Sequence, residues 1–211
     1  MYKLSEGKIF KTDITNASRT MLFNINTLSW DEELLGIFGI DKSLLPEVVM
    51  SDSSFGRIEK INNAEIHGVL GDQQAALFGH NCINSGDVKN TYGTGCFALT
   101  NTGKDIIKSD NGLLTTVAYQ MEGEDPFYAL EGSVPIAGAA VQWLRDNLNI
   151  IKSSEEIESL AMGEKNNGDV YFVPAFSGLF SPHWDETARG SLFGLTRFSN
   201  KSHMALSLIH I

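Results

Sequence analysis

Two glycine-bearing loops constrain the fold of this chain more than any other part of its sequence. The first, Gly71-Asp72-Gln73-Gln74, follows a short apolar segment and opens a helical pattern over 73–79. The second, Gly93-Thr94-Gly95, joins two segments that alternate like β-strands. A chain that contains both a strand-to-helix loop and a strand-to-strand turn is typical of a mixed α/β fold.

The side chains on these loops suit phosphoryl transfer to an alcohol. Asp72 is predicted at a strand end and near a helix N-terminus, where the helix dipole favours a carboxylate that can act as a general base. The small residues of the turn 93–95 let backbone N–H groups approach an anion, and Thr94 adds a hydroxyl donor. A base together with a phosphate-binding turn indicates phosphoryl transfer. Taken singly, Asp72 is more typical of a turn or helix cap, and 93–95 is more typical of a hairpin turn than of a nucleotide site.

The N-terminal part of the chain is predicted to contain short strands and a capped helix. Residues 8–14 alternate loosely, as in an edge strand. Ser29 and Glu32 have the capping-box spacing, so we expect Ser29 to cap a helix that Gly39 ends. Near the second loop, Asn101-Thr102-Gly103 is typical of a turn.

The C-terminal part is predicted to alternate strands with helices. We expect strands over 88–92, 97–100, 113–119, 127–130 and 170–173, helices over 134–148 and 154–162, a long loop over 174–190 and a further helix from Leu206. The change of pattern near Ser85 predicts two domains, 1–84 and 85–211.

The helix over 134–148 has the clearest periodicity. We expect Gly132-Ser133 to open it. One face of this helix is apolar and carries Ala137, Val141, Leu144 and Leu148.

Length and charge narrow the classes of function. The 211 residues are 42% hydrophobic and 20% charged, as in a folded protein of one or two domains. The net charge of −10 argues against nucleic acid as a partner, because nucleic-acid phosphates favour basic surfaces. It does not exclude a phosphate substrate, since a metal ion and backbone dipoles can neutralise phosphate inside an acidic protein.

The sequence shows no pattern for a disulfide framework, a metal site or membrane insertion. Cys82 and Cys96 lack metal-ligand spacing, and we expect reduced thiols in an intracellular protein. The five histidines show no metal spacing either. Without a long apolar run or a signal-peptide core, the sequence predicts a cytoplasmic protein with no membrane segment.

Longer motifs carry a resemblance to a known family. They are GDQQAALFG, KNTYGTGCF, NGLLTTVAY, YALEGSVPIAGAAVQWLRDNL and VYFVPAFSGLFSP. Read together, they resemble the glycerol kinases of the FGGY family of carbohydrate kinases, over about 8–207. The resemblance implies an actin-like, ribonuclease-H-like ATPase fold of class α/β. Residues 1–84 would be the end of its first domain and 85–211 the start of its second, nucleotide-binding domain.

The resemblance also implies a reaction. The parent enzyme would transfer the γ-phosphoryl group of ATP, with Mg²⁺, to glycerol and give sn-glycerol 3-phosphate. Asp72 would be the general base, and Asp72, Gln73 and Phe97 would bind glycerol. From the residues alone, Phe97 is also compatible with core packing.

The nucleotide contacts implied by the resemblance are Thr94, Gly138 and Gln142. A glycine inside a helix costs about 1 kcal/mol relative to alanine, so Gly138 indicates the close approach of a ligand or of another backbone. Packing of 137–140 against another helix is the alternative.

Other matched residues receive no catalytic role. Asn16, Ser18 and Arg19 are expected in an ordered loop that supports the site. We expect Arg189 to form a structural salt bridge rather than to bind phosphate, and His183 to be exposed.

Parts of the family pattern are missing. They include its N-terminal phosphate loop, an Arg-Glu pair and the end of the nucleotide domain, and 208–211 depart from it where an acidic residue is expected near His210. We therefore expect a central fragment, inactive alone, of a homo-oligomeric parent. The alternatives are another FGGY sugar or polyol kinase, a non-catalytic truncated product, and an actin- or chaperone-like ATPase.

Overall fold

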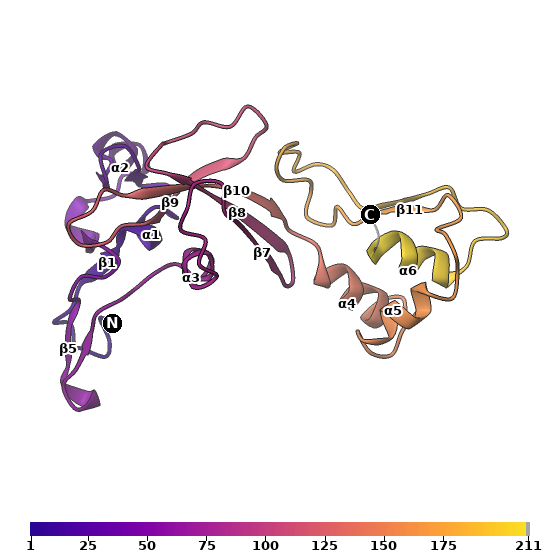
Figure 1. The fold of residues 1–211 in the computed structure, drawn as a ribbon, viewed down its shortest axis with the longest axis horizontal. Coiled ribbons are helices and arrows are strands. Elements are labelled where there is room, and N and C mark those ends of the chain that lie inside the picture. The colour runs from indigo at the N-terminus through magenta and orange to yellow at the C-terminus, as the bar shows by residue number, and fades with distance from the viewer. Residues whose placement is uncertain (210–211) are drawn as a thin grey trace. The chain divides into compact units, whose positions relative to one another are not determined.

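The chain consists of two compact units, seen in a computed structural model that describes residues 1–209 (Figure 1). The first unit comprises Met1–Lys89 and Ala98–Glu131, and the second comprises Asn90–Phe97 and the chain from Gly132 onward. The departure from the family pattern expected near His210 lies outside the described residues.

The first unit contains short strands, helices and single 3-10 turns. In chain order they are β1 (Lys11–Asp13), α1 (Ile14–Ala17), β2 (Phe23–Asn24), β3 (Ser29–Trp30), α2 (Glu32–Phe38), η1 (Lys42–Leu44), β4 (Glu47–Val49), β5 (Gly56–Ile58), η2 (Glu59–Ile61), β6 (Ala64–Ile66), α3 (Asp72–Gly79), β7 (Val88–Tyr92), β8 (Cys96–Gly103), β9 (Leu114–Tyr119) and β10 (Phe127–Val134). The unit division falls within β7, β8 and β10, so their remaining residues belong to the second unit.

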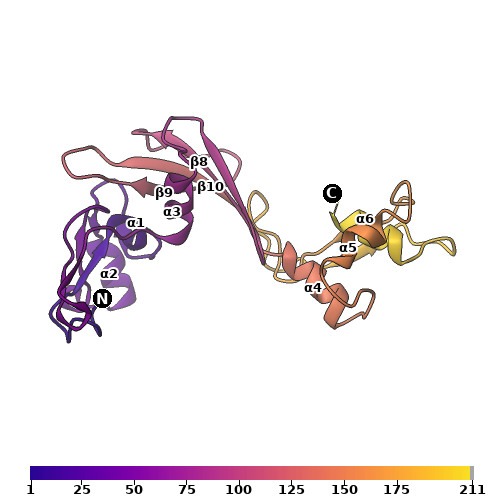
Figure 2. The ribbon, with the colours of Figure 1, turned by 60° about the horizontal axis from the view of Figure 1, so that its bottom comes forward.

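The main sheet of the first unit has four strands in the order β7-β8-β10-β9. β10 runs antiparallel to β9, with Tyr128 opposite Val117. Separately, β1 pairs in parallel with β4, Lys11 opposite Glu47. Helices α1 and α3 both contact β9, and Figure 2 shows them close to this sheet.

Two apolar clusters meet at β9 because successive side chains of a strand point to opposite faces. Val117 belongs to a cluster with Ile14, Ala17, Phe23, Trp30, Leu35 and Tyr128. Its neighbour Ala118 belongs to the other, with Leu77, Cys82, Leu99, Tyr119 and Ala129. Through Leu77, the second cluster fixes α3 against the sheet, and the position of its first residue, Asp72, is fixed with it.

The second unit contains α4 (Gly138–Asp146), α5 (Glu156–Ala161), β11 (Tyr171–Val173), β12 (Ser191–Phe193) and α6 (Lys201–Ile209). Trp143 of α4 packs against Phe172 and Phe176, with ring centroids 5.9 and 5.0 Å away. Helices α5 and α6 lie side by side, and α6 also packs on β11 (Figure 1).

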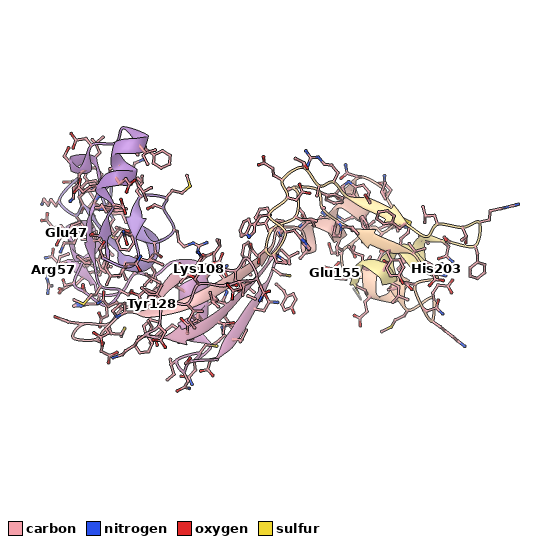
Figure 3. The ribbon with its side chains drawn as sticks, turned by 90° about the horizontal axis from the view of Figure 1, so that it is seen from above. Glu47, Arg57, Lys108, Tyr128, Glu155 and His203 are labelled. Atoms are coloured by element: carbon pink, nitrogen blue, oxygen red, sulfur yellow. The ribbon has the colours of Figure 1, made fainter. Side chains whose placement is uncertain are left out.

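His203 holds the start of α6 (labelled in Figure 3). It is 2% exposed, and its Nδ1 accepts the N–H of Asn200 at 3.2 Å. Asn200 in turn accepts the N–H groups of Ser202 and His203 at 2.8 and 3.2 Å, as a helix cap does. These bonds begin α6 earlier than the predicted start at Leu206.

Several predicted elements are confirmed. They are the helix starting at the GDQ loop, the strands on both sides of 93–95, the strands near 114–119 and 127–134, and the helix end at Gly39. Gly39 has φ of 64°, a left-handed conformation that glycine adopts without strain.

The predicted cap at Ser29 is wrong. Asp31 caps α2, because its carboxylate accepts the N–H groups of Glu33 and Leu34 at 3.0 and 3.1 Å. Ser29 lies in β3, where its hydroxyl is 2.9 Å from that of Thr27. The Asp31 carboxylate, next to the first residue of α2, therefore caps the helix in place of the predicted Ser29-Glu32 capping box.

Other predicted boundaries are also corrected. Residues 101–103 continue β8 rather than forming a turn, and the edge strand over 8–14 is reduced to β1. The helix predicted over 134–148 is only α4, because Gly132-Ser133 extends β10 instead of opening a helix. Leu148, predicted on the apolar face, lies beyond α4 and is exposed.

No helix within residues 1–209 has the length and apolar character needed to cross a membrane.

Candidate functional site

A buried chain of hydrogen bonds fixes the residue that precedes Asp72. Gly71 is the N-cap of α3, and its N–H donates to Thr15 Oγ1 at 2.7 Å. The Thr15 hydroxyl donates to Asp13 Oδ2 at 2.6 Å. Asp13 and Thr15 are fully buried, so α1 and the start of α3 are joined without solvent between them.

Asp13 is the centre of this hydrogen-bond chain. Its carboxylate also accepts the N–H groups of Thr15 and Asn16 at 2.9 and 3.1 Å and the Ser51 hydroxyl at 3.1 Å. These bonds cap α1, so Asn16 lies in a helix and Ser18 at its C-cap, where the sequence predicted a loop. The sequence predicted that this segment supports the site, and the hydrogen bond from Gly71 to Thr15 is the contact through which it does so.

The Gly-Asp-Gln-Gln sequence places an exposed Asp72 and a half-buried Gln73 between the buried residues Gly71 and Gln74. A Cβ at Gly71 would lie 2.6 Å from Gln74 Oε1, so glycine leaves room for the buried Gln74, whose amide donates to the Val117 carbonyl at 3.3 Å. Asp72, by contrast, is exposed at the first residue of α3. The helix start was predicted correctly, but β6 ends at Ile66, so Asp72 does not follow directly on a strand.

The carboxylate and amide of the site are coupled to a buried lysine. Asp72 Oδ1 accepts the N–H of Gln73 at 2.8 Å, and Gln73 Oε1 accepts a hydrogen bond from Lys89 Nζ. Lys89 is only 5% exposed. Burial lowers the pKa of Lys89, and the negative charges of Glu131 and Asp72 oppose that shift.

Glu131 is itself paired with a cation. Its Oε1 accepts a hydrogen bond from the Arg19 guanidinium at 3.0 Å, and Oε2 lies 2.9 Å from the second guanidinium nitrogen without the alignment of a hydrogen bond. Arg19, matched in sequence but given no catalytic role, therefore anchors the buried carboxylate that faces the Lys89 charge.

In the second unit, the turn 93–95 is built into the start of α4. The Gly93 carbonyl accepts the N–H of Gly138 at 2.9 Å, and the Thr94 carbonyl accepts those of Ala137 and Ala139 at 2.8 and 3.1 Å. The backbone N–H groups at the start of α4 are therefore already used in these bonds and are not available to bind an anion. The N–H of Gly93 is also engaged, by the Gly95 carbonyl at 2.9 Å.

Close backbone approach explains two glycines here. A Cβ at Gly138 would lie 2.6 Å from the Gly93 carbonyl oxygen, and one at Gly95 would lie 2.6 Å from that of Val134. Gly138 is the first residue of α4, not an interior one. Of the explanations given for Gly138, the close approach of another backbone agrees with this contact, and that backbone is the turn 93–95.

The remaining predicted site residues of the second unit differ in exposure. Thr94 and Gln142 are exposed, whereas Phe97, the second residue of β8, is half-buried. His183 is exposed, as expected. Arg189 donates to the carbonyls of Glu186 and Ala188 at 2.8 and 2.7 Å, so carbonyl bonds replace the expected salt bridge within the described chain.

Comparison with known proteins places both units in one family. Sequence profiles of the FGGY family of carbohydrate kinases match the chain twice, the N-terminal domain over 1–79 and the C-terminal domain over 88–210. This chain belongs to the FGGY family of carbohydrate kinases. The boundary at 84/85 predicted from the sequence falls between the two matches and stays a prediction.

Individual FGGY relatives resemble the chain along nearly all of its length. It is 57% identical to a glycerol kinase of Brucella anthropi over 203 residues, 95% of this chain and 41% of that protein. The chain therefore spans about two fifths of the length of this relative. Among solved structures, Plasmodium falciparum glycerol kinase with ADP has 42% identity and a TM-score of 0.85, covering 98% of this chain and 42% of that one.

A second solved FGGY kinase is more distant. The gluconate kinase of Lactobacillus acidophilus has 27% identity and a TM-score of 0.78, covering 94% of this chain and 41% of that one. The actin-like, ribonuclease-H-like α/β fold class predicted from the sequence is confirmed.

The candidate site of this chain depends on residues that the sequence did not single out. Asp13, Thr15 and Gln74 hold the loop before Asp72, and Lys89 binds Gln73. Their only signal in the sequence was membership of a matched motif, GDQQAALFG for Gln74 and KNTYGTGCF for Lys89. No group of three or more His, Cys, Asp or Glu side chains within residues 1–209 is placed to hold a metal ion.

Proposed function

We propose that the full-length protein is a kinase that transfers the γ-phosphoryl group of ATP to glycerol and gives sn-glycerol 3-phosphate. Support comes from the 57% identity to a glycerol kinase over 95% of this chain, against 27% to a gluconate kinase. This difference favours glycerol over the substrates of other FGGY kinases.

The observation that carries the proposal is the exposed carboxylate of Asp72 on a backbone fixed by buried hydrogen bonds. Phosphoryl transfer depends on positioning, and a carboxylate within reach of the alcohol accepts its proton as the transfer proceeds. Asp72 is the proposed base. Gln73 and Phe97 are proposed to bind glycerol together with Asp72.

Nucleotide binding is proposed for the second unit. Thr94 and Gln142 are exposed, and Gly138 joins the turn 93–95 to α4. The Plasmodium glycerol kinase was crystallised with ADP, which supports ATP as the phosphoryl donor. Thr94, Gly138 and Gln142 are the proposed nucleotide contacts.

Mg²⁺ is proposed to arrive with ATP. Mg²⁺ keeps water ligands and binds chiefly through substrate phosphates, whose charge it neutralises during transfer. The described residues offer no cluster suited to hold it, so no residue of this chain is assigned to the metal.

The location, partners and assembly of the protein are proposed as well. The free thiols of Cys82 and Cys96 are consistent with a reducing, cytoplasmic location. The net charge of −10 disfavours nucleic acid as a partner. We also propose a homo-oligomeric full-length protein with a domain boundary near Ser85. The 211-residue chain alone is proposed to be inactive, because it spans about two fifths of the length of the glycerol kinase that it matches and catalysis depends on complete positioning.

The test is the Asp72→Asn variant of the full-length protein. With glycerol and Mg-ATP, ADP release is expected to fall about 10²- to 10⁴-fold in kcat, the usual contribution of a general base. Asp110→Asn, which alters an exposed carboxylate, is the matched control and should keep wild-type kcat. An Asp72→Asn enzyme with wild-type kcat would exclude Asp72 as the base. A wild type that uses another polyol but not glycerol would favour a different FGGY kinase.

A further inference from the structure

Lys89 is buried although lysine is among the residues least often found inside proteins. It lies on β7, with 5% of its surface exposed, between the exposed residues Val88 and Asn90. A buried ammonium group requires partners that compensate for lost hydration. The identity of those partners indicates what Lys89 does.

The partners of Lys89 come from α3 and β10, two elements that lie far apart in the sequence. Lys89 Nζ donates to Gln73 Oε1 in the first turn of α3. Glu131 on β10 and Asp72 on α3 supply negative charge that favours the ammonium form. Glu131 is 3% exposed and is held by Arg19, so its charge has a fixed position.

The chemistry of lysine decides how the Gln73 amide is oriented. An ammonium group has hydrogen-bond donors and no acceptor, whereas an amide has one end of each kind. With Lys89 beside it, Gln73 must turn Oε1 inward and leave Nε2 as its outward end. Nε2 lies 3.5 Å from Asp72 Oδ2, at the long limit of a hydrogen bond.

We propose that Lys89 is a positioning residue: by binding Gln73 Oε1, it directs the Nε2 donor toward the substrate hydroxyl that Asp72 deprotonates. The hydroxyl oxygen then accepts from Gln73 while its proton points to Asp72. The site thereby selects a group that donates and accepts at one atom, an alcohol. This inference rests on the proposed function, because it assigns the alcohol to the Asp72-Gln73 pair.

The first experiment is Lys89→Met in the full-length kinase, with Lys104→Met as the matched control. Lys104 is an exposed lysine that pairs with Asp125 at 2.8 Å, away from Gln73. In Lys89→Met the amide is free to rotate, and we expect KM for glycerol to rise about tenfold or more with KM for ATP unchanged. Lys104→Met should keep both values, and Lys89→Arg, which retains a donor-only head group, should recover part of the glycerol affinity.

The second experiment keeps Lys89 and changes its partner. The carboxylate of Gln73→Glu still accepts from Lys89 but cannot donate to a hydroxyl. We expect this variant to lose glycerol affinity by at least as much as Lys89→Met, again with KM for ATP unchanged. It also preserves the test if Lys89→Met does not fold.

The measured KM values distinguish a failure of this inference from a failure of the proposed function. The inference is overturned if folded Lys89→Met keeps KM for glycerol within about twofold of wild type, if KM for ATP rises in parallel, or if Gln73→Glu binds glycerol normally. A wild-type enzyme that does not phosphorylate glycerol contradicts the proposed function and this inference with it. An active wild type with a normal Lys89→Met variant contradicts the inference alone.

Discussion

The hydroxyl oxygen of Thr15 lies 2.7 Å from the backbone nitrogen of Gly71, the residue that precedes Asp72. The two residues are 56 positions apart along the chain, yet the Thr15 side chain is fully buried at the contact. Because the same hydroxyl donates to Asp13, it cannot be replaced by a group that only donates or only accepts.

Thr15→Val tests this link, since valine keeps the volume and removes the hydroxyl. The variant leaves the Gly71 N–H without its partner and removes one of the three donors to Asp13 Oδ2, and we expect it to lower the free energy of unfolding by about 1–3 kcal/mol. Thr20→Val is the control, because Thr20 is exposed and water replaces its bonds. Chemical denaturation of both variants gives the comparison. Equal stabilities would show that the Thr15 hydroxyl is not needed to hold Gly71.

Gly138→Ala tests the contact between α4 and the turn 93–95. The added methyl group would meet the Gly93 carbonyl oxygen at 2.6 Å, a backbone atom that cannot move aside alone. Overpacking of this kind costs about 1–3 kcal/mol, and we expect a matching fall in the unfolding free energy.

Gly36→Ala is the opposite case and serves as its control. A Cβ at Gly36 meets nothing within 4 Å, and the residue is interior to α2. Alanine there is expected to stabilise the chain by about 0.5–1 kcal/mol through helix propensity and a less flexible unfolded state. In chemical denaturation, the free energy of unfolding should therefore fall for Gly138→Ala and rise for Gly36→Ala. A change in the same direction for both variants would contradict the assigned contacts.

Asp31→Ala tests which residue caps α2, and predicts a pH dependence. The amide of Asn24, 2.8 Å away, and the N–H groups of Leu34 and Glu33 hold the pKa of the Asp31 carboxyl below its ordinary value of 3.8. A depressed folded-state pKa stabilises the fold above pH 3.8, and that stability is lost as the pH falls through the folded-state pKa. Asp31→Ala should therefore lower the midpoint of thermal unfolding at neutral pH, by an amount that shrinks in acid.

Ser29→Ala is the matched variant for this cap. Ser29 lies in β3 and accepts no hydrogen bond from the first turn of α2, so the midpoint of Ser29→Ala should stay close to that of wild type at every pH. A larger loss from Ser29→Ala than from Asp31→Ala would restore the capping box that the sequence predicted.

Local signals made much of the fold predictable. The helix after Gly71, the strands around 93–95 and the helix end at Gly39 each depend on residues close together in sequence. The cap of α2 was missed because Ser29 and Asp31 are both good cap residues, and only the backbone path decides between them. The start of α4 was missed because Val134 continues the pairing of β10.

The support of the candidate site could not be predicted in the same way. From the sequence, Thr15 belongs to a predicted loop and Lys89 to a predicted strand, and neither position indicates the contacts that distant segments make with it. The burial of Lys89 depends on Gln73 and on Glu131, and the position of Glu131 depends on Arg19. Contacts between residues so far apart in the sequence leave no local pattern that could predict them. Asp72 and Gln73 could be singled out because they belong to a short, contiguous motif.

The bonds between the turn 93–95 and the first turn of α4 have a consequence for ligand recognition. Because Thr94 and α4, which bears Gln142, share these bonds, the two side chains are carried on one rigid piece of backbone. A nucleotide that touches both would meet contacts whose spacing is already set before it arrives. Little ordering entropy would then be lost on binding, which favours affinity without an accompanying rearrangement.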